Sequence, residues 1–160
     1  MSETLVDEAL VLDRVPYGDH DLVTALLTRN NGRASLFARG ARRRRPRFGA
    51  ALDLHCLVEA EWRPPRAGTL GVLVRADLLD DHRTLRGDLD GLLLASFAAE
   101  AIKETCPEGE PVPSVFALQA ALLARLCRSP TEPAAAPTRT WPSLWIAFQI
   151  KLLGLLGYAP

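Results

Sequence analysis

A chain of 160 residues, of which 48% are hydrophobic, is long enough to bury a core and too apolar to be disordered throughout. Its 19 basic and 19 acidic residues leave a formal net charge of zero, which excludes electrostatic attraction of the whole molecule to nucleic acid. Binding to an anionic partner would therefore need a local cluster of positive charge.

The cysteines and the N-terminus predict a protein of the reducing cytoplasm. The three cysteines, Cys56, Cys106 and Cys127, are odd in number and form no Cys-x-x-Cys pair, so neither a zinc site nor a disulfide framework is predicted. Acidic residues occupy N-terminal positions where a secretion signal needs positive charge. The apolar stretch from 144 to 156 is shorter than the roughly 20 residues that span a bilayer, so we expect no membrane association.

In chain order, the first part of the sequence predicts five short strands. Turn-forming residues close the first two, Pro16 to Asp19 after the first and Asn30 to Gly32 after the second. Short strands with Gly- and Pro-rich connections are typical of a small barrel, and the five-stranded OB-fold is the commonest such barrel that binds nucleic acid. An SH3-like barrel is also compatible with the pattern. The predicted strands are 9–15, 22–28, 33–39, 52–62 and 70–79.

The third predicted strand has two chemically different faces. Because side chains alternate along a strand, one face carries Ala34, Leu36 and Ala38. The other face carries Arg33, Ser35, Phe37 and Arg39. This second face is interpreted as a wet, basic surface on which Phe37 is available for stacking, although packing of Phe37 in the core fits the pattern equally well.

The connection after this strand is an arginine run from Arg39 to Gly49 that contains no acidic residue. Guanidinium groups bind phosphate through paired hydrogen bonds, and neighbouring ones repel each other until an anion lies between them. Pro46 and Gly49 are unfavourable in a regular helix, so we expect a flexible clamp that becomes ordered on DNA. A solvated basic loop is the alternative. The arginines of the run are Arg39, Arg42, Arg43, Arg44, Arg45 and Arg47.

Residues on either side of the run extend the predicted nucleic-acid-binding site. Arg33 lengthens the basic patch along the third strand, and Arg63 and Arg66 before the fifth strand are expected to close the groove. Either Phe37 or Phe48 is expected to stack on a base, which is worth about 1–3 kcal/mol in single-strand binding. Binding should be weakly sequence-selective, because phosphate contacts carry no base information.

The second half of the sequence changes to helical periodicity. Asp88 is the predicted N-cap of a first helix that runs to Thr105, and Ser114 is the predicted cap of a second helix. Residues 129–140, rich in proline and alanine, are expected to form a loop before a third helix with Gly157 at its C′ position. Because the third helix is apolar on more than one side, we expect it at the centre of the helical part. The predicted fold class is α+β, with an OB-fold barrel over residues 1–80 and a helical domain over residues 81–160.

The sequence contains no recognisable catalytic constellation. Glycine-rich phosphate loops and nucleophile-elbow motifs are absent from it. His55 and Cys56 are neighbours on a predicted strand, so their side chains would point to opposite faces and could not act together. The histidine-containing acidic triplets at 19–21 and 80–82 are interpreted as ordinary polar turns. We therefore expect no catalytic residues, no metal and no cofactor.

Short strings in both halves of the chain form a recognisable pattern. The N-terminal half contains Ala9-Leu-Val-Leu, Tyr17-Gly-Asp, Leu26-Leu-Thr, Gly32-Arg and Ala38-Arg-Gly-Ala-Arg-Arg. The C-terminal half contains Pro107-Glu-Gly-Glu-Pro, Val115-Phe-Ala-Leu and Lys151-Leu-Leu-Gly-Leu-Leu-Gly-Tyr-Ala-Pro. In this order, and over nearly the whole chain, they resemble the N-terminal and helical regions of the bacterial recombination mediator family RecO.

The resemblance implies an OB-fold, a helical domain and a non-enzymatic role in DNA repair by the RecF pathway in the bacterial cytoplasm, associated with the nucleoid. Family members bind single- and double-stranded DNA, anneal complementary strands, and act with RecR and single-strand-binding protein to help load the recombinase RecA. On this sequence the implied DNA contacts are Arg39, Arg42, Arg43 and their neighbours. Many members continue past the Gly-Tyr-Ala-Pro string into a four-cysteine zinc module, whereas this sequence stops at Pro160, so zinc is not expected here.

The leading hypothesis is therefore a DNA-binding accessory protein of repair and recombination. The alternative is a protein-interaction module whose arginine run docks on an acidic partner without binding nucleic acid. The two differ in whether an oligonucleotide binds at low salt.

Overall fold

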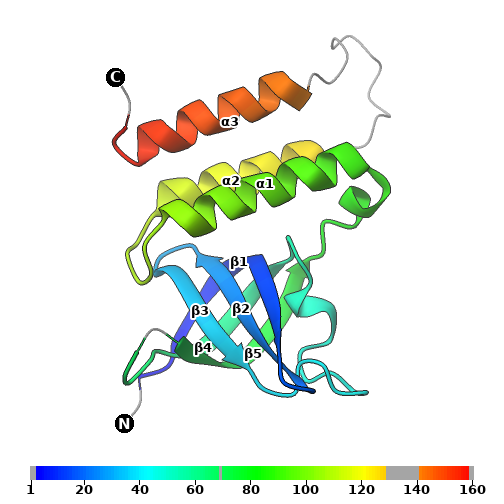
Figure 1. Ribbon diagram of the computed structural model, residues 1–160, viewed down its shortest axis with the longest axis vertical. Helices are drawn as coiled ribbons and strands as arrows, with labels where there is room; N and C mark the ends of the chain where they lie inside the picture. Colours follow the sequence, from blue (N-terminus) through cyan, green and yellow to red (C-terminus); the bar gives the residue numbers. More distant parts are fainter. Residues whose placement is uncertain (1–2, 69, 129–140, 159–160) are drawn as a thin grey trace.

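A closed five-stranded barrel and three helices make up the computed structural model, which describes residues 3–68, 70–128 and 141–158 (Figure 1). The strands are β1 (Leu5–Tyr17), β2 (Asp21–Thr28), β3 (Gly32–Ala38), β4 (Leu57–Arg63) and β5 (Leu70–Asp80). Short 3-10 helices, η1 (Gly49–Leu52) and η2 (Arg83–Gly87), precede β4 and the first α-helix. The α-helices are α1 (Leu89–Thr105), α2 (Pro113–Leu126) and α3 (Trp141–Leu155).

The order of the strands around the barrel is β1-β2-β3-β5-β4, and β4 pairs with β1 to close it. All neighbouring strands are antiparallel except β3 and β5, which pair in parallel. The long first strand contacts both β2 and β4, with a bulge between Val11 and Asp13 where the ladder bends. This is an OB-like barrel followed by helices, so the predicted α+β class is confirmed.

The fourth strand begins later than the sequence predicts. Residues 52–56 were expected in a strand, but Leu52 ends η1 and His55 has a left-handed backbone (φ 67°). Leu52 is 2% exposed, and it packs inside the barrel with Phe48 and Ala51. The apolar character of this segment therefore reflects burial of a short helical turn and not strand pairing.

Burial on both faces explains the apolar run near the start of the chain. Ala9 and Val11 point into the barrel core, whereas Leu10 and Leu12 point outward and pack in a cluster with α1 and α2. On β2, Leu27 joins the same outer cluster. A strand covered on both sides is expected to be continuously hydrophobic. The predicted halves 1–80 and 81–160 thus share one apolar contact surface.

Two of the three predicted capping residues agree with the structure. The side chain of Asp88 caps α1 by accepting a hydrogen bond from the Gly91 backbone N–H at 3.1 Å. Gly157 (φ 84°) ends α3 with two hydrogen bonds of the Schellman type, one of them from Tyr158 N–H to Leu153 C=O. The prediction that Ser114 caps α2 is wrong, because the helix already begins at Pro113, a residue favoured in the first turn. The loop predicted at 129–140 lies outside the described residues.

The third helix lies on the outside of the molecule. Figure 1 shows α1 and α2 next to the barrel, with α3 on their far side. Only Phe148 and Leu152 of α3 are buried, whereas Ile146 and Ile150 are 54% and 65% exposed. The prediction that α3 fills the centre is therefore wrong, because the barrel-facing positions belong to α1 and α2. Within the described residues, no helix has both the length and the apolar character needed to cross a membrane.

Candidate nucleic-acid interface

The arginine loop, residues 39–48, is anchored to the turn between β1 and β2. The Gly40 N–H donates to the Asp21 carboxylate at 2.7 Å, and the Arg42 N–H donates to the His20 carbonyl at 2.8 Å. The Arg42 side chain also donates to the Gly18 carbonyl at 3.1 Å. The loop is therefore attached to the barrel at Gly40 and Arg42, and the expectation that it becomes ordered on DNA stays a prediction.

Among the described residues, the cations of this loop differ from seven others, which have acidic partners. All six arginines of the loop are exposed, and neither they nor Arg63 form an ion pair within residues 3–68, 70–128 and 141–158. Arg42 and Arg47 donate instead to backbone carbonyls. Elsewhere the pairs include Arg14 with Asp53, Arg29 with Glu8, Arg33 with Glu108, Arg75 with Asp77, Arg83 with Asp81, Arg86 with Asp53, and Lys103 with Asp13. Uncompensated positive charge is thus concentrated on and beside one loop.

Beside the arginine loop, an apolar row crosses the outer surface of the barrel. The strand register places Val15 opposite Val23, Val23 opposite Phe37, and Phe37 opposite Val72. We call these four residues the outer row. The Tyr17 ring packs edge-to-face on Phe37, with ring centroids 5.5 Å apart and an interplanar angle of 90°. An aromatic pair therefore stands at the edge of the cationic cluster.

A groove of about 380 Å³ joins the outer row to the cations, and we call it the basic groove. Its cations are Arg39, Arg47 and Arg63, and Asp21 is the carboxylate that lines it. A second hollow beside it is lined by Arg39, Gly40, Arg43, Arg45 and Arg47. The full lining of the basic groove is Asp21, Phe37, Arg39, Arg47, Arg63, Val72, Leu73 and Val74. Strands, the β1–β2 turn and the arginine loop thus converge on one surface.

The structure brings most of the predicted site residues together. Phe37, Arg39, Arg47 and Arg63 line the basic groove. The exposed residues Arg42, Arg43, Arg44 and Arg45 follow along the loop. Arg66 is exposed on the β4–β5 connection but does not line the groove.

Two predicted site residues do not belong to this surface. Phe48 is 7% exposed and packs in the barrel core, with the Arg47 guanidinium 5.3 Å from its ring centroid, so it cannot stack on a base. Arg33 lies near the other end of β3, about 20 Å from Arg39 at roughly 3.3 Å per residue. Its guanidinium donates to Glu108 at 3.0 Å and to the Cys106 carbonyl at 2.9 Å, so it holds the helical part and does not extend the patch.

Sequence reasoning missed Tyr17 and Asp21. The sequence predicts a turn at both positions, yet they are opposite one another at the end of the β1–β2 hairpin. Folding that hairpin symmetrically about residues 18–20 would have placed Tyr17 near the face of the sheet that carries Phe37.

The neighbouring residues His55 and Cys56 are not on a strand, so the geometric reason for excluding their cooperation was wrong. Burial lowers the pKa of His55 to about 4, with a further contribution from nearby His82, and burial raises the pKa of Cys56 to about 11. The His55 Nε2 lies 3.2 Å from the Ser96 hydroxyl. A thiol with a raised pKa is a poor nucleophile at neutral pH, so this pair does not form a thiolate–imidazolium couple. Within the described part of the chain, no cluster of three or more His, Cys, Asp or Glu is arranged to hold a metal ion.

Comparison with family models identifies the chain. Residues 1–82 match the model described as Recombination protein O N terminal, and residues 86–160 match that described as Recombination protein O C terminal. The chain belongs to the RecO family. The two matched segments meet in η2, between the barrel and α1.

Individual RecO relatives agree with this assignment. The DNA repair protein RecO of Pelobacter propionicus is 39% identical over 153 residues, which are 96% of this chain and 58% of that protein. The DNA repair protein RecO of Anaeromyxobacter dehalogenans strain 2CP-C is 40% identical over 94% of this chain and 56% of that protein. That of Myxococcus xanthus is 33% identical over 96% of this chain and 59% of that protein. The chain therefore spans about half the length of the curated relatives that it matches.

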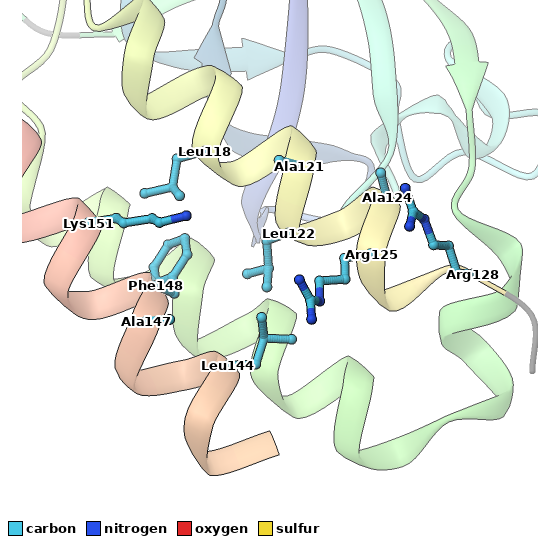
Figure 2. Close-up of a pocket in the computed structure, with 10 residues that line it drawn as sticks. All are labelled: Leu118, Ala121, Leu122, Ala124, Arg125, Arg128, Leu144, Ala147, Phe148 and Lys151. Atoms are coloured by element: carbon cyan, nitrogen blue, oxygen red, sulfur yellow. The ribbon is translucent and has the colours of Figure 1, made fainter. Parts of the chain in front are cut away.

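The RecO C-terminal segment contains a second groove, between α2 and α3, of about 390 Å³. Figure 2 shows that side chains from both helices line it. Leu118, Leu122 and Phe148 supply apolar surface, and Arg125 and Lys151 supply positive charge at its rim. The remaining lining residues are Ala121, Ala124, Arg128, Leu144 and Ala147. We call this the helical groove.

Proposed function

We propose that this chain is a non-enzymatic DNA-binding accessory protein of repair and recombination, and that its arginine loop neutralises DNA phosphates. The observation that carries the proposal is the group of exposed arginines without acidic partners, in a chain whose formal net charge is zero. Folding guanidiniums into one loop costs electrostatic free energy, which a bound polyanion would recover. Membership of the RecO family supports the same role.

The expected binding is electrostatic, with weak sequence selectivity. Each neutralised phosphate releases counterions, so four contacts to single-stranded DNA give a logarithmic salt slope of roughly −3, from about −0.7 per contact. Contacts of this type serve both single- and double-stranded DNA, and they would allow the chain to hold one strand while a complementary strand anneals.

Fluorescence anisotropy with a labelled single-stranded oligonucleotide across a salt series tests the proposal. Replacing Arg42 through Arg45 by Ala should reduce the magnitude of the slope by up to about 3. A matched comparison uses two pairs of substitutions: R43A/R45A on the loop should reduce it by about 1.4, and R75A/R83A should leave it unchanged because both arginines already have acidic partners. Equal slopes for the two double variants would contradict the assignment.

The same titration distinguishes the proposed function from the alternative, in which the arginine loop docks on an acidic protein. The alternative predicts no oligonucleotide binding by the wild type at low salt, together with binding to an acidic protein that the R43A/R45A variant loses. Guanidiniums in a loop suit either anion, and only the family membership favours DNA.

We also propose that the helical groove binds a protein partner. The family resemblance implies two partners, RecR and single-strand-binding protein, and we assign the groove to single-strand-binding protein. An apolar floor beside cations is complementary to a segment that combines apolar and acidic residues. Any help in loading the recombinase RecA would then be an indirect effect. Calorimetry with single-strand-binding protein should show at least about tenfold weaker binding for K151E, and unchanged binding for the distant control R83E. Loss in both variants, or in neither, would count against this site.

A further inference from the structure

We propose that Tyr17 and Phe37 form a base-stacking platform that makes the basic groove select unpaired strands over duplex DNA. This inference rests on the proposed function, in which the arginine loop holds the phosphates. It assigns the recognition of bases to a different surface, the outer row and the aromatic pair at its edge.

The first supporting observation is the exposure of apolar side chains on the barrel surface. Val15, Tyr17 and Val72 are 53%, 59% and 45% exposed. The outward positions of the adjoining β4 are instead charged, namely Glu59, Glu61 and Arg63. Val23 and Phe37 are half-buried between these exposed side chains. Outward residues of a barrel are normally polar, so an apolar row that is exposed at both ends and lies beside a groove indicates a ligand-binding surface.

The second observation is that the aromatic pair is held in position. Phe37 lies between Val23 and Val72 in the strand register, which keeps its ring on the outer surface. Tyr17 contacts one side of that ring, and within the described residues its hydroxyl forms no hydrogen bond. A ring that is already fixed loses little conformational entropy when a base stacks on it.

The third observation is the position of the cations relative to the rings. Arg39, Arg47 and Arg63 line the same groove as Phe37 and Val72. A single strand can place its phosphates on the guanidiniums and turn its bases onto the rings. The bases of a duplex already stack on one another inside the helix, so a duplex can use the arginines but not the platform.

The test compares single-stranded and duplex oligonucleotides of the same length by anisotropy, each over the same series of salt concentrations. Y17L and F37L keep an apolar side chain and remove the ring, and we expect each to weaken single-strand binding by about 5-fold to 100-fold while duplex binding stays within about 2-fold. The salt slope should not change, because no phosphate contact is lost. Y17F and F37Y, which keep a ring, should bind like the wild type.

An abasic oligonucleotide provides a second measurement that needs no protein variant. The wild-type chain should bind it at least as weakly as Y17L or F37L binds the normal strand, because an abasic strand has no base to place on either ring. Equal losses for strand and duplex, or no loss in Y17L and F37L, would overturn the platform while leaving phosphate binding by the arginine loop intact. A wild-type chain that binds neither strand nor duplex would instead overturn the proposed function, and the platform with it.

Discussion

The Asp21 carboxylate accepts a hydrogen bond from the Gly40 N–H at 2.7 Å, which places a negative charge inside the most positive region of the protein. Two effects of this carboxylate on DNA binding oppose each other. It repels phosphate, and it fixes the point at which the arginine loop leaves the barrel. Substitutions at this position separate the two effects.

We expect D21N to bind single-stranded DNA about 2- to 5-fold more tightly than the wild type, because the amide oxygen can still accept from Gly40 while the repulsive charge is gone. D21A removes the charge and the acceptor together, and it should bind more weakly than D21N. Anisotropy titrations of the three proteins in one buffer measure both differences. Identical affinities for D21N and D21A would show that the bond to Gly40 does not position the loop.

The buried His55 predicts a loss of stability on acidification. Its pKa is lowered to about 4 in the folded protein, from about 6.5 in an unfolded chain, so the unfolded state binds more protons between these values. Stability should therefore be constant above pH 6.5 and fall as the pH drops toward 4, by about 3 kcal/mol at 1.36 kcal/mol per pKa unit. Carboxylates add their own dependence, so a reference variant is needed. Urea unfolding of H55N, in which Asn tolerates the left-handed backbone, should lack this component, and parallel pH curves for both proteins would contradict the prediction.

Phe48 lies in the barrel core, whereas Phe37 lines the basic groove, so substitutions at the two positions should affect different properties. Because Phe48 is buried in the barrel, F48A should lower the free energy of unfolding by about 3–5 kcal/mol. F48L keeps most of the buried volume, so it should cost less than F48A and bind DNA as the wild type does. Thermal unfolding and anisotropy on the same preparations check this. A folded F48L that loses single-strand binding would return Phe48 to the interface.

The contact between Gly32 and Glu110 predicts a large effect from a single methyl group. A Cβ at Gly32 would lie 2.1 Å from the Glu110 carbonyl oxygen, and the backbone there has φ 73°. G18A is the matched control, since Gly18 also has a positive φ (58°) but nothing within 4 Å of the added atom. We expect G18A to cost about 1–2 kcal/mol, the price of a left-handed alanine, and G32A to cost at least about 1–2 kcal/mol more. Equal urea midpoints for G18A and G32A would mean that the α1–α2 connection, which carries Glu110, moves away from the added methyl group at no cost in stability.

Local patterns predicted much of this fold, because the forces behind them act over short distances along the chain. The alternation along β3 correctly placed Leu36 and Ala38 inside, and Asp88 was correctly identified as a cap. The failures depend on distant residues. Arg33 finds Glu108, 75 positions away, and no periodicity reports such a partner.

In the candidate site, too, features set by neighbouring residues were predictable and features set by distant residues were not. The arginine loop was visible as a run of like charge, whereas the burial of Phe48 follows from the turn that η1 makes beneath it. The outer placement of α3 likewise depends on α1 and α2, which occupy the positions next to the barrel. The sequence of α3 alone does not contain this information. Tyr17 could be recognised as part of the site only from the strand register, because Tyr17 and its ring partner Phe37 lie on different strands.

The attachment of β3 to the segment between α1 and α2 has a mechanical consequence. Arg33 pairs with Glu108, and the Gly109 N–H donates to the Arg33 carbonyl at 2.9 Å. The covalent connection through η2 and this contact hold the helices to the barrel at separate places along the chain. The helices therefore cannot swing about η2 as a hinge without breaking the β3 contact. A pull on the α1–α2 connection is carried along one strand whose other end bears Phe37, so tension on the helical part is borne by the strand that faces the basic groove.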